Sequence, residues 1–189
     1  DGGLTWAVPS GADALGDVID WWFLDETRGW AIDRPSGHLR QTVDGGLHWT
    51  DAGVLPPAPV AVRMRSSTQG LLLAESAVYE TRDGGKTWVK RTTLDQGSVL
   101  AYADAANAWA AGVGSLMHSS DGGETWNQVT VSCGFPSCEW KWDAIQFVDA
   151  QHGWVSGRDG VFATTDGGKT WTRRRAPHML SNLWARKLQ

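Results

Sequence analysis

The sequence predicts an all-β protein made of repeated four-stranded antiparallel units, of the kind that form the blades of a β-propeller. Two observations predict this fold. A motif of the form Thr/Ser-x-Asp-Gly-Gly-x-x-Trp recurs along the chain, and its aspartates stand 38 to 45 residues apart, which is about the length of a propeller blade. A second motif, Phe-x-Asp followed by Gly-Trp, precedes the first and is clearest at residues 23–30 and 147–154. Two landmarks in a fixed order are far harder to obtain by chance than one.

The last complete unit shows how four strands follow one another. Residues 142–148, 153–157 and 161–165 read as strands, because β-prone residues there are bounded by turn residues. An Asp-Gly-Gly turn then leads into a fourth strand from residue 170 to about 174. Asp-Gly between β-rich runs is a strong hairpin signal, since glycine accepts a positive φ at no steric cost. The other units predict first strands at residues 18–24, 60–65 and 98–103.

These units predict one propeller region over residues 1–189. The chain opens inside a copy of the first motif, at Asp1, and we expect it to be part of a larger propeller. The expected divisions are the end of a preceding blade at 1–15, four blades at 16–52, 53–94, 95–131 and 132–175, and the start of a following or closing blade at 176–189.

The Asp-Gly-Gly motif is expected to be structural. An aspartate at the start of a tight turn accepts N–H groups from the residues that follow, and a tryptophan at its end buries a large apolar area. Near-identical turns placed once per blade do not converge on one point, which argues against a catalytic or calcium-binding role. The residues are Asp44 with Trp49, Asp83 with Trp88, Asp121 with Trp126, and Asp166 with Trp171.

Composition and charge narrow the classes of function. The net charge of −4 gives no general attraction to nucleic acid. No apolar stretch approaches the roughly 20 residues that cross a bilayer, so no membrane span is expected. The five histidines and two cysteines lack metal-ligand spacing, and the glycine-rich turns read as hairpins. We therefore expect no metal and no cofactor.

Residues that break the repeat are the candidates for function. Trp22 and Arg63 occupy equivalent positions on the first strands of adjacent blades, where the last unit has Gln146. Arg65 lies two residues further on, and arginine with tryptophan is typical of protein-binding surfaces. The three residues Trp22, Arg63 and Arg65 form our candidate binding patch.

Two other features remain open. Asp20 and Asp143 occupy equivalent places on the first strands of two blades, where they could face a central channel. Paired carboxylates there would suit a glycosidase, although exposed polar strand positions explain them as well. Cys133 and Cys138 lie in a Pro/Gly-rich insertion. They fit a small disulfide ring in an exported protein, or a pair of reduced thiols in a cytosolic one.

The Thr-x-Asp-Gly-Gly-x-Thr-Trp motif resembles the Asp box, or bacterial neuraminidase repeat, of sialidases, xyloglucanase-type glycosidases, sortilin-like receptors and photosystem II assembly factors. The sialidase catalytic set has no match, and Tyr79 and Tyr102 are the only tyrosines. Together with Phe-x-Asp-x-x-x-Gly-Trp, the pattern over residues 16–172 is similar to the photosystem II stability/assembly factor family.

That resemblance implies a seven-bladed, lumenal or exported propeller that binds partner proteins through an arginine-rich surface without catalysis. The expected function is thus a non-catalytic protein-binding or assembly scaffold outside the cytoplasm. One alternative is that the chain forms part of a carbohydrate-active enzyme, with carbohydrate as its ligand. The other is that it is a structural module of a surface assembly.

Overall fold

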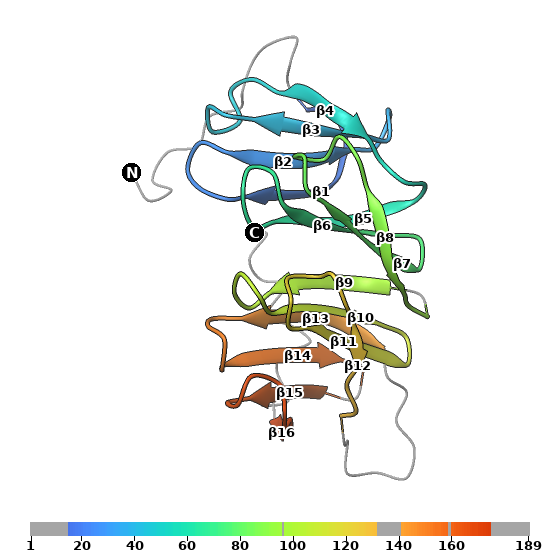
Figure 1. Cartoon of the computed structure of the whole chain (residues 1–189), viewed down its shortest axis with the longest axis vertical. Coiled ribbons are helices and arrows are strands. Elements are labelled where there is room, and N and C mark those ends of the chain that lie inside the picture. Colours follow the sequence, from blue (N-terminus) through green and yellow to red (C-terminus); the bar gives the residue numbers. More distant parts are fainter. Residues whose placement is uncertain (1–14, 96, 132–140, 159, 175–189) are drawn as a thin grey trace, which may run out of the picture. The chain divides into compact units, whose positions relative to one another are not determined.

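The computed structural model describes residues 15–95, 97–131, 141–158 and 160–174, and divides the chain into two compact units, 1–93 and 94–189. Every described element is a β-strand, and the strands form four separate four-stranded antiparallel sheets (Figure 1). The prediction of repeated four-stranded β units is confirmed.

Each sheet is a meander in which consecutive strands pair, and each unit contains two sheets. In the first unit the strands are β1 (Val18–Phe23), β2 (Gly29–Asp33), β3 (His38–Thr42) and β4 (Thr50–Val54), then β5 (Pro59–Met64), β6 (Gly70–Ala74), β7 (Ala77–Thr81) and β8 (Val89–Thr93). In the second they are β9 (Gly97–Tyr102), β10 (Ala108–Gly112), β11 (Ser115–Ser119) and β12 (Asn127–Gln128), then β13 (Trp142–Phe147), β14 (Gly153–Gly157), β15 (Gly160–Thr164) and β16 (Thr172–Arg174).

The Phe-x-Asp motif forms the turn between the first two strands of a sheet. The Oδ1 atom of Asp25 accepts the N–H groups of Thr27 and Arg28 at 2.9 and 2.8 Å, which fixes an Asx turn. Asp104 and Asp149 do the same in their own sheets. The second sheet has Ser66 at this position, and its Oγ accepts the N–H groups of Thr68 and Gln69. The second repeat, which lacks the aspartate, therefore keeps the turn with a different acceptor.

The first strand of every sheet contains a β-bulge at the same position of the repeat. The pairing register shifts between Val18 and Asp20, and at corresponding points in the other three first strands. A bulge adds one unpaired residue and reverses which face the preceding side chains occupy. Beyond it, Trp22, Arg63, Ala101 and Gln146 all pair with the second residue of the next strand, so the predicted equivalence of Trp22, Arg63 and Gln146 is confirmed.

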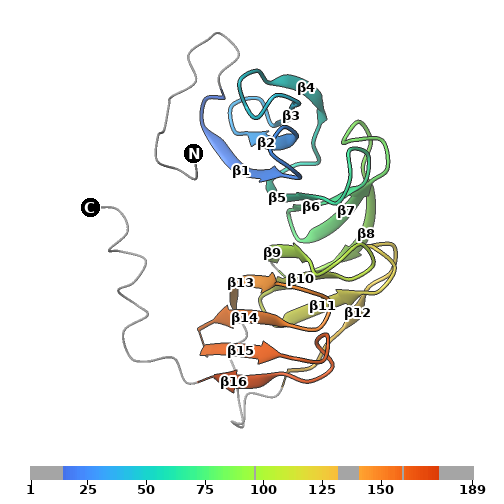
Figure 2. The ribbon, with the colours of Figure 1, turned by 90° about the vertical axis from the view of Figure 1, so that its left-hand side faces the viewer.

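Within the first unit, β1 lies beside β5 (Figure 2), and side chains from both sheets form one core. Trp30, Ile32 and Leu39 come from the first sheet, and Val62 and Leu72 from the second; all five are fully buried. Burying a large apolar side chain contributes about 1.5 to 3 kcal/mol, so this shared core holds the two sheets together.

The second unit has a core richer in aromatic rings, and β9 lies beside β13. Trp109 on β10 is buried and stacks on Phe147, with centroids 5.2 Å apart, and it meets Trp171 edge-on at 5.7 Å. Phe162 meets Trp142 edge-on at 5.9 Å. Offset and edge-to-face pairs of this kind add to the stabilisation from burial.

In the described part of the chain no helix is long and apolar enough to cross a membrane.

Candidate functional site

Each Asp-Gly-Gly turn is closed by one repeated set of hydrogen bonds. In the second copy, Thr81 Oγ1 donates to Asp83 Oδ1 at 2.9 Å and accepts the Gly85 N–H at 2.9 Å. Asp83 accepts the N–H of Thr87 at 2.9 Å and its hydroxyl at 2.6 Å. Trp88 Nε1 donates to the Gly85 carbonyl at 3.0 Å. Among the described residues, the donors to Asp83 all belong to its own turn.

The same contacts recur in the copies around Asp44, Asp121 and Asp166. The first copy has His48 in place of threonine, and its Nδ1 lies 2.7 Å from Asp44 Oδ2. This position matches that of the threonine hydroxyls, which donate at 2.5 to 2.6 Å in the other copies.

These bonds stabilise the ionised carboxylates. The side-chain hydroxyl of Thr87, followed by its backbone N–H, lowers the pKa of Asp83 to about 2. The backbone N–H of His48, then its side chain, lowers the pKa of Asp44 to about 2, and Thr170 lowers that of Asp166 to about 2. A carboxylate committed to donors in its own turn is poorly suited to accept a proton from a substrate.

The second glycine of the turn also meets the preceding sheet. Gly168 has φ +82°, and a Cβ there would overlap the Trp109 ring. Gly85 has φ +99°, and a Cβ there would overlap the Leu39 side chain. Left-handed φ favours glycine at both positions, and the neighbouring sheet also fills the space that a side chain would need.

The structure brings Trp22 and Arg63 together across β1 and β5. The Arg63 Cζ atom lies 5.1 Å from the centre of the Trp22 ring, within the range of a cation–π interaction. Trp22 Nε1 donates to the Met64 carbonyl at 2.8 Å. Both side chains stay partly accessible, and Arg63 is 22% exposed.

Asp20 completes this cluster, which we call the Asp20–Trp22–Arg63 cluster. Its Oδ2 accepts from Arg63 Nη1 at 2.6 Å and from the Val62 N–H at 2.9 Å. The residue is only 22% exposed. One carboxylate oxygen therefore joins the backbone and the side chain of the neighbouring sheet, so Asp20 links the two sheets. Sequence analysis did not predict this ion pair, because Asp20 and Arg63 are 43 residues apart.

The expected equivalence of Asp20 and Asp143 is wrong by one residue. Aligned on Phe23 and Phe147, Asp20 pairs with Ile32 as Ala144 pairs with Ser156. Asp143 lies at the bulge and is exposed. A displacement of one residue moves a strand side chain to the other face, so these carboxylates do not occupy matching places.

The remaining predicted residues are placed as follows. Arg65 comes directly after β5 and is half-buried, and its backbone N–H donates to the Gln69 carbonyl at 2.9 Å. Cys133 and Cys138 lie outside the described residues. Among the residues that the structure describes, no group of three or more His, Cys, Asp or Glu side chains could hold a metal ion.

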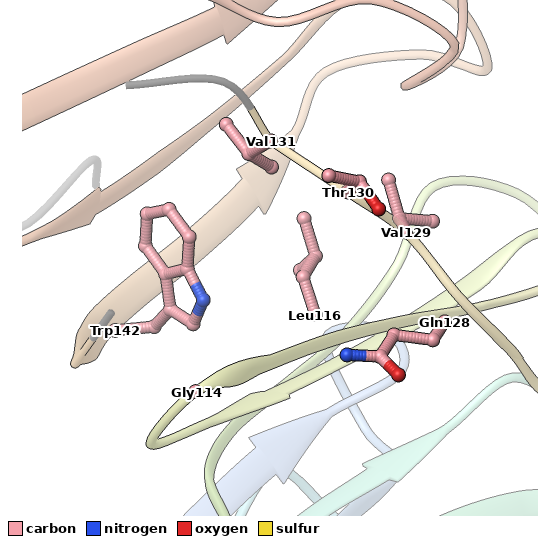
Figure 3. Close-up of a pocket in the computed structure, with 7 residues that line it drawn as sticks. All are labelled: Gly114, Leu116, Gln128, Val129, Thr130, Val131 and Trp142. Carbon is pink, nitrogen blue, oxygen red and sulfur yellow. The ribbon is translucent and has the colours of Figure 1, made fainter. Parts of the chain in front are cut away.

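The second unit contains two hollows that the sequence did not predict. A small one of about 80 Å³ lies beside Leu116, Val131 and the Trp142 indole, with the Gln128 amide at its edge (Figure 3). A larger groove of about 520 Å³ lies between the third and fourth sheets. Its lining combines residues more than 60 positions apart, from Asn107 to Lys169, which explains why no local sequence pattern revealed it.

Comparison with known proteins supports the resemblance seen in the motifs. The family model described as Photosynthesis system II assembly factor YCF48 matches residues 55–145, and the BNR/Asp-box repeat model matches residues 162–173. A curated relative, the Photosystem II assembly lipoprotein Ycf48 of Synechococcus sp. (strain CC9902), is 28% identical over 128 residues. That match covers 61% of this chain and 38% of the relative.

Solved structures show the same fold. YCF48 from Cyanidioschyzon merolae matches with a TM-score of 0.60 and 16% identity, over 85% of this chain and 57% of that one. An ancestral GH74 enzyme matches with a TM-score of 0.72 and 18% identity, over 89% of this chain and 25% of that one. The chain is thus an Asp-box propeller chain that spans only part of the length of these relatives, and at such identities the structural likeness shows the fold alone.

Proposed function

We propose that this Asp-box propeller chain, similar to the photosystem II assembly factor family, serves as a non-catalytic scaffold that binds a partner protein. The Asp20–Trp22–Arg63 cluster, extended by Arg65, is the proposed contact site. Tryptophan and arginine are the residues most enriched among those that dominate binding energy at protein interfaces.

The observation that carries this proposal is the arrangement of the cluster. Asp20 and the Trp22 ring hold the Arg63 guanidinium in one place while leaving it partly accessible. A preorganised guanidinium loses less conformational entropy on binding than a free one. The same contacts commit Asp20 to an ion pair, which favours binding over the glycosidase alternative.

The proposed location is outside the cytoplasm. The name of the Synechococcus relative, a lipoprotein, supports it, and so does the spacing of Cys133 and Cys138. We propose a disulfide between these two cysteines. Alkylation of the unreduced, denatured chain followed by mass spectrometry tests it: no added alkyl group is expected before reduction and two after it. Two added groups before reduction would contradict the proposal.

Binding can be tested on an array of 12-residue peptides rich in acidic and aromatic residues, with Kd then measured in solution for the tightest binder. Trp22→Phe, Arg63→Met and Arg65→Ser are each expected to weaken binding about tenfold or more. Gln146→Ala is the matched control, because Gln146 occupies the position of Trp22 and Arg63 in the fourth sheet.

Two results would contradict this function. One is equal peptide affinity in all four variants while circular dichroism shows each of them folded. The other is turnover of a glycan or sialoside panel that Asp20→Asn abolishes, since this would make Asp20 a catalytic carboxylate and favour the carbohydrate-active alternative.

A further inference from the structure

The outer strand of the third sheet differs from the other three outer strands. Outer strands of sheets commonly carry charges that prevent pairing with other chains. The outer strands of the other sheets carry Asp51, Lys90, Arg91, Arg173 and Arg174. In contrast, β12 and the residues after it read Asn127-Gln128-Val129-Thr130-Val131, with no charge and three β-branched residues. This segment is suited to pair with another strand.

Its outward hydrogen-bonding groups can be identified from the register. The Val129 N–H donates inward, to the Leu116 carbonyl on β11, at 2.7 Å. Successive N–H groups of a strand point to opposite sides. The N–H groups of Gln128 and Thr130 therefore point away from β11, where an added strand would accept them. Gln128 and Thr130 are both exposed.

The groove of about 520 Å³ lies directly beside this edge. Residues 128–130 form one side of it, and the fourth sheet contributes Gln151 and Lys169. Gln128 and Gln151 bring side-chain amides to the groove, whereas the Asn107 amide is already bonded to Asp104 and His118. An amide both donates and accepts, so it matches the main chain of a peptide.

Two charged side chains, Asp166 and Lys169, line the groove. The ionised Asp166 carboxylate is held by Thr164 and Thr170 in its own turn, whereas the Lys169 ammonium group forms no ion pair with any residue that the structure describes. His118 also lines the groove, stacked on Trp109 with centroids 4.3 Å apart. Burial lowers the pKa of His118, so its ring is neutral at pH 7. Lys169 is therefore the group in the groove with which an acidic side chain of a ligand can pair.

We infer that the edge formed by residues 127–131 and the adjoining groove bind an extended peptide segment of a partner protein. The segment adds a strand to the third sheet, and one of its acidic side chains pairs with Lys169. This is strand addition, in which main-chain bonds supply affinity and side-chain pockets supply specificity. The site is separate from the Asp20–Trp22–Arg63 cluster and goes beyond the function proposed for it.

The test uses synthetic eight-residue peptides of alternating valine and threonine, with one glutamate moved through each position in turn, and a second set with lysine in its place. Fluorescence anisotropy on the full chain is expected to show binding of at least one glutamate peptide and at least tenfold weaker binding of its lysine partner. Lys169→Glu should reverse that preference. Lys86→Glu is the matched control, since Lys86 holds the same place in the second Asp box, and it should change nothing.

A second variant tests the main-chain bonds. Thr130→Pro removes one outward N–H and leaves the bond of Val129 to β11, so peptide affinity should fall at least tenfold while thermal unfolding stays close to that of the parent.

Failure of every glutamate peptide to bind, or equal effects of Lys169→Glu and Lys86→Glu, overturns the inference. Self-association that Thr130→Pro abolishes in sedimentation without peptide would assign the edge to a second copy and also overturn it. Trp22→Phe should leave this binding intact, which separates the outcome from that of the proposed function.

Discussion

The Nδ1 atom of His48 lies 2.7 Å from Asp44 Oδ2, where the three other Asp boxes that the structure describes place a threonine hydroxyl. The His48 backbone N–H also donates to Asp44 Oδ1, at 3.0 Å. An imidazole and a hydroxyl thus meet the same requirement of the turn, which is a donor aimed at the second carboxylate oxygen.

We expect His48→Thr to keep the melting temperature of the chain, because a hydroxyl would take over the bond to Asp44. His48→Ala removes the side-chain donor and should lower the melting temperature by about 2 to 4 °C. Thermal unfolding followed by circular dichroism at pH 7 measures both. Equal melting temperatures for the alanine and threonine variants would show that the side-chain bond has no role in stability.

Gly168→Ala should destabilise the chain by about 3 kcal/mol, because the new methyl group overlaps Trp109 and φ is left-handed. Gly114→Ala is the control: its φ is +74° but no atom lies within 4 Å of the new methyl group, so only the backbone cost of about 1 kcal/mol applies. Urea unfolding of the two variants separates steric from backbone effects. A similar loss in both would exclude the contact with Trp109 as the cause.

The ion pair of Asp20 and Arg63 should contribute a coupling energy of about 1 to 2 kcal/mol, because both side chains are mostly shielded from water. A double-mutant cycle with Asp20→Asn and Arg63→Met, read out by urea unfolding, measures it. The asparagine keeps an oxygen for the Val62 N–H, so the cycle isolates the charge. Additive effects would mean that the pair does not join the two sheets energetically.

Acid should destabilise the Asp boxes over a defined range. The folded pKa of Asp83 is about 2, against about 3.9 for an unperturbed aspartate. A lowered folded pKa contributes stability that is complete above the unfolded pKa and is lost as the pH falls from about 4 to about 2. Thr87→Val removes the donor with the largest effect, so the pKa of Asp83 should rise. Carboxyl-carbon NMR titration checks this, and a midpoint near 4 in the parent chain would contradict the geometry.

The repeat made the strands predictable, and their ends fall within about two residues of the positions expected. Trp22, Arg63 and Gln146 could be aligned because each lies three residues after the bulge residue and one before the Phe position. Asp143 was misaligned by one residue: the register that aligns Phe23 with Phe147 places Asp20 with Ala144, and Asp143 itself holds the bulge position that Ile19 holds in the first sheet. The meeting of Asp20 with Arg63 and the groove beside Lys169 depend on how two sheets pack, which local patterns do not encode.

The contacts of Leu39 with Gly85 and of Trp109 with Gly168 each set a large apolar side chain of one sheet against a glycine of the next sheet. The glycine accepts either side chain, so this contact alone does not require matched residues in the two sheets. The shared core and the Asp20–Arg63 pair do require them. A blade moved beside a new neighbour would therefore keep the glycine contact but would need compensating changes in the core and at the ion pair.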